Sequence, residues 1–117
     1  MKKVLVTGGY GLLGISLVNF ILKKNIKVVI LDYKKYSKKK SFFLKSKNLI
    51  IEKGNFVNYS NLLKIFKKHK FDGIFHLGAQ TQVLKAYYDP YDTYQTNVVG
   101  TLNLLEILRK KKLNIPI

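Results

Sequence analysis

The feature that most restricts the fold is a glycine-rich turn between an apolar, β-prone run and an apolar segment with helical spacing. Four of the eight glycines in this 117-residue chain lie within residues 8–14, in the stretch VLVTGGYGLLG (4–14). Glycine reaches backbone angles that other residues avoid and lets groups approach the main chain closely, at a cost in conformational entropy. The clustering therefore predicts a tight turn or a ligand held against the backbone.

Short apolar runs alternate with helical segments along the chain. The expected strands cover residues 2–7, 27–32, 48–54 and 71–78, and LNIPI (113–117) is typical of the first residues of a fifth strand. The first expected helix covers residues 12–24, with Leu12, Ile15, Val18 and Leu22 at helical spacing. The second covers 59–70, with Ser60 as N-cap and with Leu62, Leu63 and Phe66 facing inward. The third covers 89–112. This alternation predicts an α/β fold, with βαβ units around a parallel sheet and helices on its faces.

The formal net charge of +16 raises the question of a nucleic-acid partner. Of the 22 basic residues 21 are Lys, whereas Arg is the usual reader of base edges and phosphates. The chain is also rich in Ile, Asn and Tyr and holds only two Ala, a pattern that A/T-rich codons explain. We therefore expect no specific nucleic-acid partner, although a basic nucleic-acid binder remains an alternative that would bind DNA with a steep salt dependence.

The N-terminal 22 residues resemble a signal peptide or a short membrane span, because residues 4–22 carry no charge. The glycine cluster and Asn19 interrupt the apolar run, and no small-residue cleavage pattern follows. We expect a strand, turn and helix here, and no membrane association. The chain has no cysteine, which excludes disulfides and thiolate metal sites and suits the cytoplasm.

The glycine turn matches a phosphate-binding motif. Gly9, Gly11 and Gly14 fit G-x-G-x-x-G between a predicted strand and a predicted helix, where backbone amides bind a pyrophosphate. Asp32 ends the second predicted strand, eighteen residues after Gly14, where an acidic residue accepts hydrogen bonds from an adenosine ribose. A carboxylate there repels a 2′-phosphate, which favours NAD over NADP; the alternative interpretation of Asp32 is a solvated strand end.

Four motifs in order, VTGGYGLLG, VVILD, FHLGAQTQV and YQTNVVGTLNLLE, resemble those of one family. The chain is similar to the N-terminal part of the extended short-chain dehydrogenases/reductases, the NAD-dependent epimerase/dehydratase group that acts on nucleotide sugars. The resemblance covers essentially all of residues 1–117. It implies a Rossmann-type NAD(P)-binding domain over 1–117, ending at the start of the fifth strand, with the catalytic and substrate-binding part expected beyond it.

The resemblance also implies which residues contact the cofactor. Thr7, Gly8, Gly11 and Gly14 match the family turn T-G-x-x-G-x-x-G. Small residues at the end of the fourth strand would let the backbone run beside the dinucleotide. The implied cofactor-binding positions are Gly8, Gly11, Leu12, Leu13, Gly14, Asp32, Asn55, Phe56, Leu77, Gly78, Ala79 and Asn97.

Three of the matched positions carry an alternative interpretation. The family usually has Asp where this chain has Asn55, which can still accept a hydrogen bond from the adenine amine but carries no charge. Asn97 would support the cofactor site, or would only cap an early turn of the long helix. His76 is expected to be a structural histidine with both ring nitrogens bonded, in preference to a metal ligand or a base, and no metal site is expected.

The Tyr-x-x-x-Lys pair of the family is expected after residue 117, so we assign no catalytic residue. In the family, the Lys ammonium lowers the pKa of the tyrosine phenol, which takes a sugar hydroxyl proton as hydride leaves for nicotinamide. The one literal match, Tyr36 to Lys40, is expected by chance in a chain this rich in Tyr and Lys. This chain alone is therefore expected to bind a dinucleotide without turning over a nucleotide sugar.

The long predicted helix has apolar residues in two directions. One set would cover the sheet, and the other suggests self-association or a companion chain, as the family's dimer interface implies. The two sets, without a choice of which one covers the sheet, are Val98, Leu102 and Leu105, and Val99, Leu104 and Leu108. A non-catalytic nucleotide-binding or interaction module that kept half of the fold remains the alternative to an enzyme part.

Overall fold

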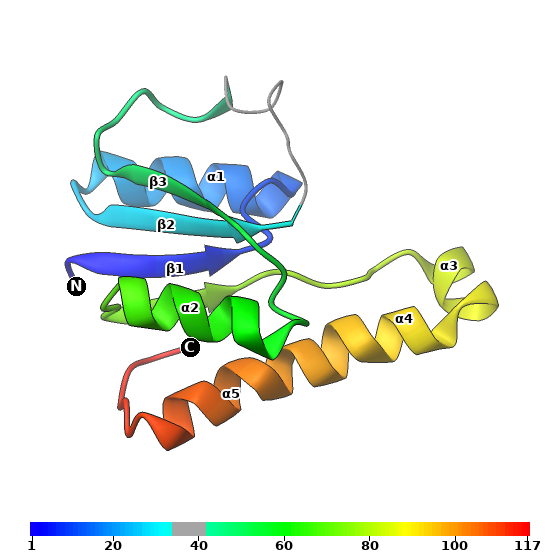
Figure 1. Cartoon of the computed structure of the whole chain (residues 1–117). Helices are drawn as coiled ribbons and strands as arrows, with labels where there is room; N and C mark the ends of the chain where they lie inside the picture. The colour runs from blue at the N-terminus through cyan, green and yellow to red at the C-terminus, as the bar shows by residue number, and fades with distance from the viewer. Residues whose placement is uncertain (34–41) are drawn as a thin grey trace.

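The computed structural model describes residues 1–33 and 42–117, and a four-stranded parallel sheet lies at its centre (Figure 1). The strands, in the spatial order β3-β2-β1-β4, are β1 (Lys3–Thr7), β2 (Lys27–Asp32), β3 (Leu49–Lys53) and β4 (Gly73–His76). All four predicted strands are confirmed, with ends shorter by up to two residues. Because β2 and β3 lie on one side of β1 and β4 on the other, the strand order reverses beside β1, which leaves a crevice at the carboxyl ends of the strands.

Helices cover both faces of the sheet, so the central strands β1 and β2 are buried on both sides, whereas the edge strand β3 is only partly buried (Figure 1). Alternate residues of β1 point to opposite faces. Val4 and Val6 pack in the cluster beneath α1 (Leu12–Lys23), whereas Leu5 packs in the cluster beneath α2 (Tyr59–Lys68) and α5 (Gly100–Lys110). Burial on both faces explains why the strands read as continuous apolar runs.

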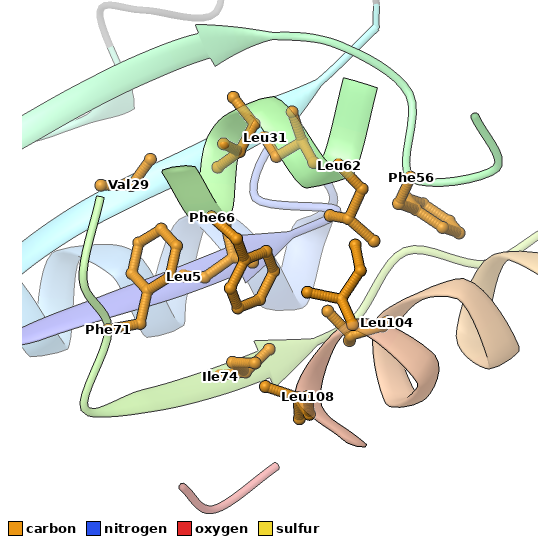
Figure 2. Close-up of a cluster of buried hydrophobic side chains, with 12 residues drawn as sticks. Leu5, Val29, Leu31, Phe56, Leu62, Phe66, Phe71, Ile74, Leu104 and Leu108 are labelled. Carbon is orange, nitrogen blue, oxygen red and sulfur yellow. The ribbon is translucent and has the colours of Figure 1, made fainter. Parts of the chain in front are cut away.

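The larger cluster joins the sheet to α2 and α5 (Figure 2). Phe66 of α2 meets Phe71 edge to face, with ring centroids 5.3 Å apart. Leu104 of α5 is fully buried in the same cluster, and Leu108 is nearly so. This cluster fixes α5 against the sheet, and with it the segment that precedes α5.

The helices differ from the sequence prediction in two ways near their starts. The N-cap of α2 is Asn58, whose Oδ1 accepts from Asn61 N–H at 3.0 Å, so the prediction of Ser60 as cap was wrong. Leu12 begins α1 but its side chain is 91% exposed, so it does not belong to the inward face. That face consists of the buried residues Gly14, Val18, Ile21 and Leu22, with the predicted Ile15 partly buried against the same cluster. The inward face of α2 is confirmed, with Leu63 partly buried.

The long helix predicted over 89–112 is divided into three parts. Asp89 caps α4 (Pro90–Tyr94), the π-helical segment η2 (Gln95–Val99) follows, and α5 completes it. A short helix that the sequence did not predict, α3 (Val83–Tyr88), precedes α4. The expected two apolar faces are present: Leu104 and Leu108 are buried, and Val98, Leu102 and Leu105 are exposed.

The last five residues lie beside the edge of β4 without joining the sheet as a strand. Ile74 N–H donates to the Pro116 carbonyl at 2.9 Å. The segment expected to begin a fifth strand therefore meets β4 through a backbone hydrogen bond.

Candidate functional site

A cavity of about 750 Å³ opens at the carboxyl ends of the strands. Its walls come from the turn after β1, the end of β2, the segment after β3, and the segment after β4. Eleven of the twelve positions predicted to bind the cofactor line it: Gly8, Gly11, Leu12, Leu13, Gly14, Asp32, Asn55, Phe56, Leu77, Gly78 and Ala79. These eleven residues, up to 71 positions apart in the chain, therefore share one cavity, and of the twelve predicted positions Asn97 alone lies outside it.

Two glycines of the first turn are required by its geometry. Gly8 has a φ of +68°, and a Cβ on it would lie 2.7 Å from the backbone of Leu77 and Gly78. A Cβ on Gly14 would lie 2.3 Å from the Gly8 carbonyl oxygen. The turn thus packs directly against the segment after β4, and the last glycine allows the close approach of helix and strand that the motif predicts.

The amino end of α1 faces the cavity with its backbone donors. Helix geometry leaves the first N–H groups, those of Leu12, Leu13 and Gly14, without intrahelical acceptors. Gly11 is the N-cap and offers no side-chain acceptor, and the first turn has no acidic residue. Donors of this kind, together with the helix dipole, favour an anion. The exposed side chains of Leu12 and Leu13 border the opening.

Asp32 marks the other wall of the cavity, at the end of β2. Its backbone carbonyl accepts from Gly54 N–H at 2.9 Å, which joins the end of β2 to the end of β3. Tyr10 lies close enough to Asp32 to sense its negative charge. Burial, and secondly this charge, raise the pKa of the Tyr10 phenol. Tyr10 and Tyr33 both line the cavity, and neither was predicted from the sequence to do so. The single sequence signal that pointed to Tyr10 as a cavity residue was its place at the variable position between Gly9 and Gly11 of the glycine motif.

Asn55 and Phe56 are held by contacts within the protein. The Oδ1 of Asn55 accepts from Val57 N–H at 3.0 Å, which leaves its second lone pair for another donor. Phe56 is only 7% exposed, and Cβ atoms on Gly78 or Gly100 would each lie 2.4 Å from its ring. The space that Gly78 leaves is therefore filled by an aromatic ring, a different reason for its small size from the one expected.

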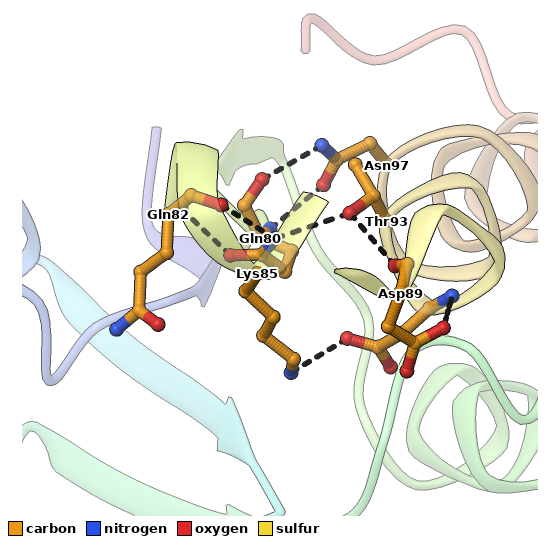
Figure 3. A network of polar contacts seen from close by, with 7 residues as sticks. Gln80, Gln82, Lys85, Asp89, Thr93 and Asn97 are labelled. Carbon is orange, nitrogen blue, oxygen red and sulfur yellow. Dashed lines mark hydrogen bonds and ion pairs between the residues drawn. The ribbon is translucent and has the colours of Figure 1, made fainter. Parts of the chain in front are cut away.

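The segment after β4 is held by side chains of α4 and η2 (Figure 3). Asn97 accepts from Gln80 N–H at 2.8 Å and donates to the Gln80 carbonyl at 2.9 Å. The Gln80 side chain donates to Thr93 Oγ1 and to the Gln82 carbonyl, both at 3.1 Å, and accepts from Gln82 N–H. Asn97 therefore acts on the cavity wall through Gln80.

Several cavity residues were not among the predicted set. Lys85 of α3 and Asp92 of α4 form an ion pair at 2.7 Å, and both line the cavity. The hydrogen bond that the Lys85 ammonium donates to Asp92, more than the charge of Asp92, raises the pKa of Lys85. Thr96, next to the predicted Asn97, lines it too, as do Gln80, Thr81 and Gln82, which lay within the quoted motif.

His76 has both ring nitrogens bonded, as the sequence analysis expected. Its Nδ1 lies 2.7 Å from Thr7 Oγ1 and its Nε2 lies 3.0 Å from Thr101 Oγ1. Burial lowers the pKa of this imidazole, which favours the neutral ring.

The described residues offer neither a metal site nor a membrane-spanning helix. Over residues 1–33 and 42–117, no three His, Asp or Glu side chains converge as metal ligands. In the same residues, no helix is long and apolar enough to cross a bilayer. The chance match from Tyr36 to Lys40 lies outside the described residues.

Comparison with known proteins agrees with this geometry. The sequence model of a family described as GDP-mannose 4,6 dehydratase matches residues 5–116. A dTDP-D-glucose 4,6-dehydratase of Dictyostelium discoideum is 34% identical over 97% of this chain and 27% of its own length. A UDP-glucose 4-epimerase of Mus musculus is 30% identical over 93% of this chain and 34% of its own length. The chain thus spans about a third of the length of the curated relatives it matches.

Solved structures share the fold. The crystal structure of UDP-glucose 4-epimerase from Thermus thermophilus in complex with NAD superposes with a TM-score of 0.82 at 26% identity, over 97% of this chain and 36% of that one. With a family match over nearly the whole chain and a Rossmann-type sheet, this chain belongs to the GDP-mannose 4,6 dehydratase family, within the epimerases and dehydratases of the extended short-chain dehydrogenases/reductases.

Proposed function

We propose that residues 1–117 form the NAD-binding domain of a nucleotide-sugar epimerase or dehydratase. The observation that carries the proposal is the convergence of the glycine turn, the amino end of α1 and Asp32 on one cavity. The names of the relatives, dTDP-glucose 4,6-dehydratase and UDP-glucose 4-epimerase, support the substrate class. When bound, NAD supplies a hydride acceptor; the chain's own residues bind and orient it.

The residues that would hold the dinucleotide follow from the cavity walls. The first-turn amides of α1 would donate to the diphosphate, and the Asp32 carboxylate would accept from ribose hydroxyls. Asn55 would accept from the adenine amine through its remaining lone pair. Leu77, Gly78 and Ala79 would lie along the cofactor. Asn97 would support the site indirectly, through Gln80.

Calorimetric titration with NAD, NADH and NADP tests this proposal. We expect NAD to bind more tightly than NADP, because Asp32 would face the 2′-phosphate, and Asp32→Asn to narrow the difference. Lys53→Gln is the matched control, since Lys53 pairs with Asp32 in the sheet register and does not line the cavity. Failure to bind any of the three dinucleotides would overturn the proposal; tighter binding of NADP would overturn the choice of NAD.

The chemistry of the whole protein is part of the same proposal. We expect the chain alone to bind NAD without converting a nucleotide sugar, because the Tyr-x-x-x-Lys pair that the family resemblance implies is expected beyond residue 117. When the purified chain is incubated with NAD and either dTDP-glucose or UDP-glucose, the nucleotide sugar and the NAD should both remain unchanged. A 4-keto product or an epimer would contradict this expectation.

The exposed apolar face that runs along η2 and α5 supports self-association. Val98, Leu102 and Leu105 are each about half exposed on the side away from the sheet. A second copy of this chain could cover the same face by isologous packing. Light scattering should give a mass above 13.5 kDa, and Leu102→Glu should lower it. Lys67→Glu on α2 is the control, and a stable monomer of the unmodified chain would refute self-association.

A further inference from the structure

The imidazole of His76 connects two threonines from distant parts of the chain. Thr7, the last residue of β1, is fully buried and pairs with His76 in the parallel register. Thr101 lies in the first turn of α5. The two hydroxyl oxygens lie 2.7 Å and 3.0 Å from the two ring nitrogens.

The other partners of the two hydroxyls fix the direction of each hydrogen bond. Thr101 Oγ1 lies 2.7 Å from the Asn97 carbonyl, which can only accept, so the single hydroxyl proton of Thr101 is donated there. Toward His76, Thr101 must therefore accept, and Nε2 carries the proton. In a neutral ring Nδ1 is then the acceptor, and the Thr7 hydroxyl donates to it.

The remaining contact of Thr7 agrees with this direction. Gly78 N–H donates to Thr7 Oγ1 at 3.1 Å, which uses the oxygen as an acceptor and leaves its proton for Nδ1. In the opposite tautomer Nε2 carries no proton. It would then face the lone pairs of the Thr101 hydroxyl, or the Thr101 hydroxyl would have to turn its proton toward Nε2 and lose its hydrogen bond to the Asn97 carbonyl. The four contacts are jointly satisfied by one tautomer of the neutral ring.

The contacts of His76 reach the segment that lines the cavity. Through Thr7 they hold Gly78 N–H, and through Thr101 they hold the backbone of Asn97, whose side chain binds Gln80 on both sides. Burial adds to the preference for a neutral ring, and the Phe56 ring packs against the imidazole in a T-shaped arrangement with an interplanar angle of 89°.

We propose that His76 is a positioning residue, fixed as its Nε2–H tautomer, that links the end of β1 to η2 and so holds residues 78–80 against the cavity. The link to cofactor binding rests on the proposed function, whereas the tautomer is a property of the ligand-free protein. The two can therefore fail separately.

Nitrogen NMR of the ligand-free chain at neutral pH tests the tautomer. The chain has two histidines, so a His69→Gln variant assigns the His76 signals. We expect Nε2 to resonate as a protonated nitrogen and Nδ1 as a bare one. An Nδ1–H ring, an even mixture or a doubly protonated ring would overturn the inference, whatever the ligand experiments give.

Two threonine variants test the link. Thr101→Val removes the hydroxyl with little change of shape and should release the tautomer into a mixture, whereas Thr101→Ser should retain Nε2–H. If Thr101→Val keeps the pure tautomer, Thr101 does not set it and the link is refuted. In calorimetry, the loss of about one hydrogen bond should weaken NAD binding roughly fivefold in Thr101→Val and should leave Thr101→Ser close to wild type. Absence of NAD binding in the unmodified chain would overturn the proposed function instead, with the tautomer result unaffected.

Discussion

Two loops border the cavity, and they are held in place by different means. The turn at residues 8–14 is shaped by its own backbone, since Gly8 and Gly14 lie where a Cβ would meet main-chain atoms. The segment at residues 77–82 is shaped by side chains further along the chain, those of Thr93 and Asn97, which lie 13 and 17 positions after Gln80. A motif of fixed spacing describes the first loop completely, whereas the second depends on contacts that no local spacing contains.

The largest effect is expected where the second loop meets the core, at Phe56. Phe56→Ala should lower the free energy of unfolding by about 4 kcal/mol, because the ring fills the space beside Gly78 and Gly100. Urea denaturation measures the change. Phe20→Ala, at an exposed position of α1, is the control and should have little effect. Equal losses in both variants would show that the ring at position 56 is not a special support.

The first loop should fail at its last glycine. Gly14→Ala places a Cβ against the Gly8 carbonyl, and we expect a loss of about 2 to 3 kcal/mol in the free energy of unfolding. Gly11→Ala is the matched control, because its Cβ would lie 3.3 Å from the same oxygen at an ordinary φ of −71°. A Gly11 variant as unstable as the Gly14 variant would contradict the assignment of close packing to Gly14.

A smaller effect is expected from the side-chain support of the second loop. Asn97→Ala removes two hydrogen bonds to the Gln80 backbone and should cost about 1 to 2 kcal/mol of unfolding free energy. Gln95→Ala, also in η2, loses only an exposed bond to the Tyr91 hydroxyl. Hydrogen exchange should show faster exchange at Gln80 N–H in the Asn97 variant alone. An unchanged exchange rate at Gln80 N–H would show that Asn97 does not hold the segment at residues 77–82 in place.

The smallest effect concerns pH. Burial lowers the pKa of His76 in the folded chain, so the unfolded chain binds the proton at a higher pH. The free energy of unfolding should therefore fall as pH drops below about 6.5, by less than about 1.4 kcal/mol per pH unit. His76→Gln should reduce this slope. Glu106, whose pKa the hydrogen bond from Arg109 lowers to about 2, titrates well below this range. An unchanged slope in the variant would refute the role of His76.

The sequence predicted those parts of the molecule that depend on local pattern. Continuous apolar runs located the four strands, and the glycine spacing with Asp32 located two walls of the cavity. The π-helical segment was not predictable, because the apolar spacing of residues 89–112 is also that of a regular helix. The helix α3 was missed for a related reason, since none of its residues is buried and its sequence has no inward stripe.

The errors at single residues have the same origin. Ser60 and Asn58 are both good N-cap residues, and only the direction of the entering chain decides between them. Asn97 carries a motif signal, yet Thr96 beside it lines the cavity, because the rotation of η2 decides which side chain faces inward. Patterns identify the segment, and packing decides the residue.

The geometry of η2 also depends on how many residues the segment 95–99 contains. The i→i+5 bonding of η2 accommodates one more residue in this turn than an α-helix would, so removing one residue from 95–99 would let the helix close with regular i→i+4 bonds. The side chains inside that turn, among them Thr96 and Asn97, would then take different directions toward the cavity and Gln80. An alignment that places a gap here would therefore compare proteins whose cavity walls are oriented differently, and the count of residues between Gln80 and Thr101 should be read as carefully as their identities.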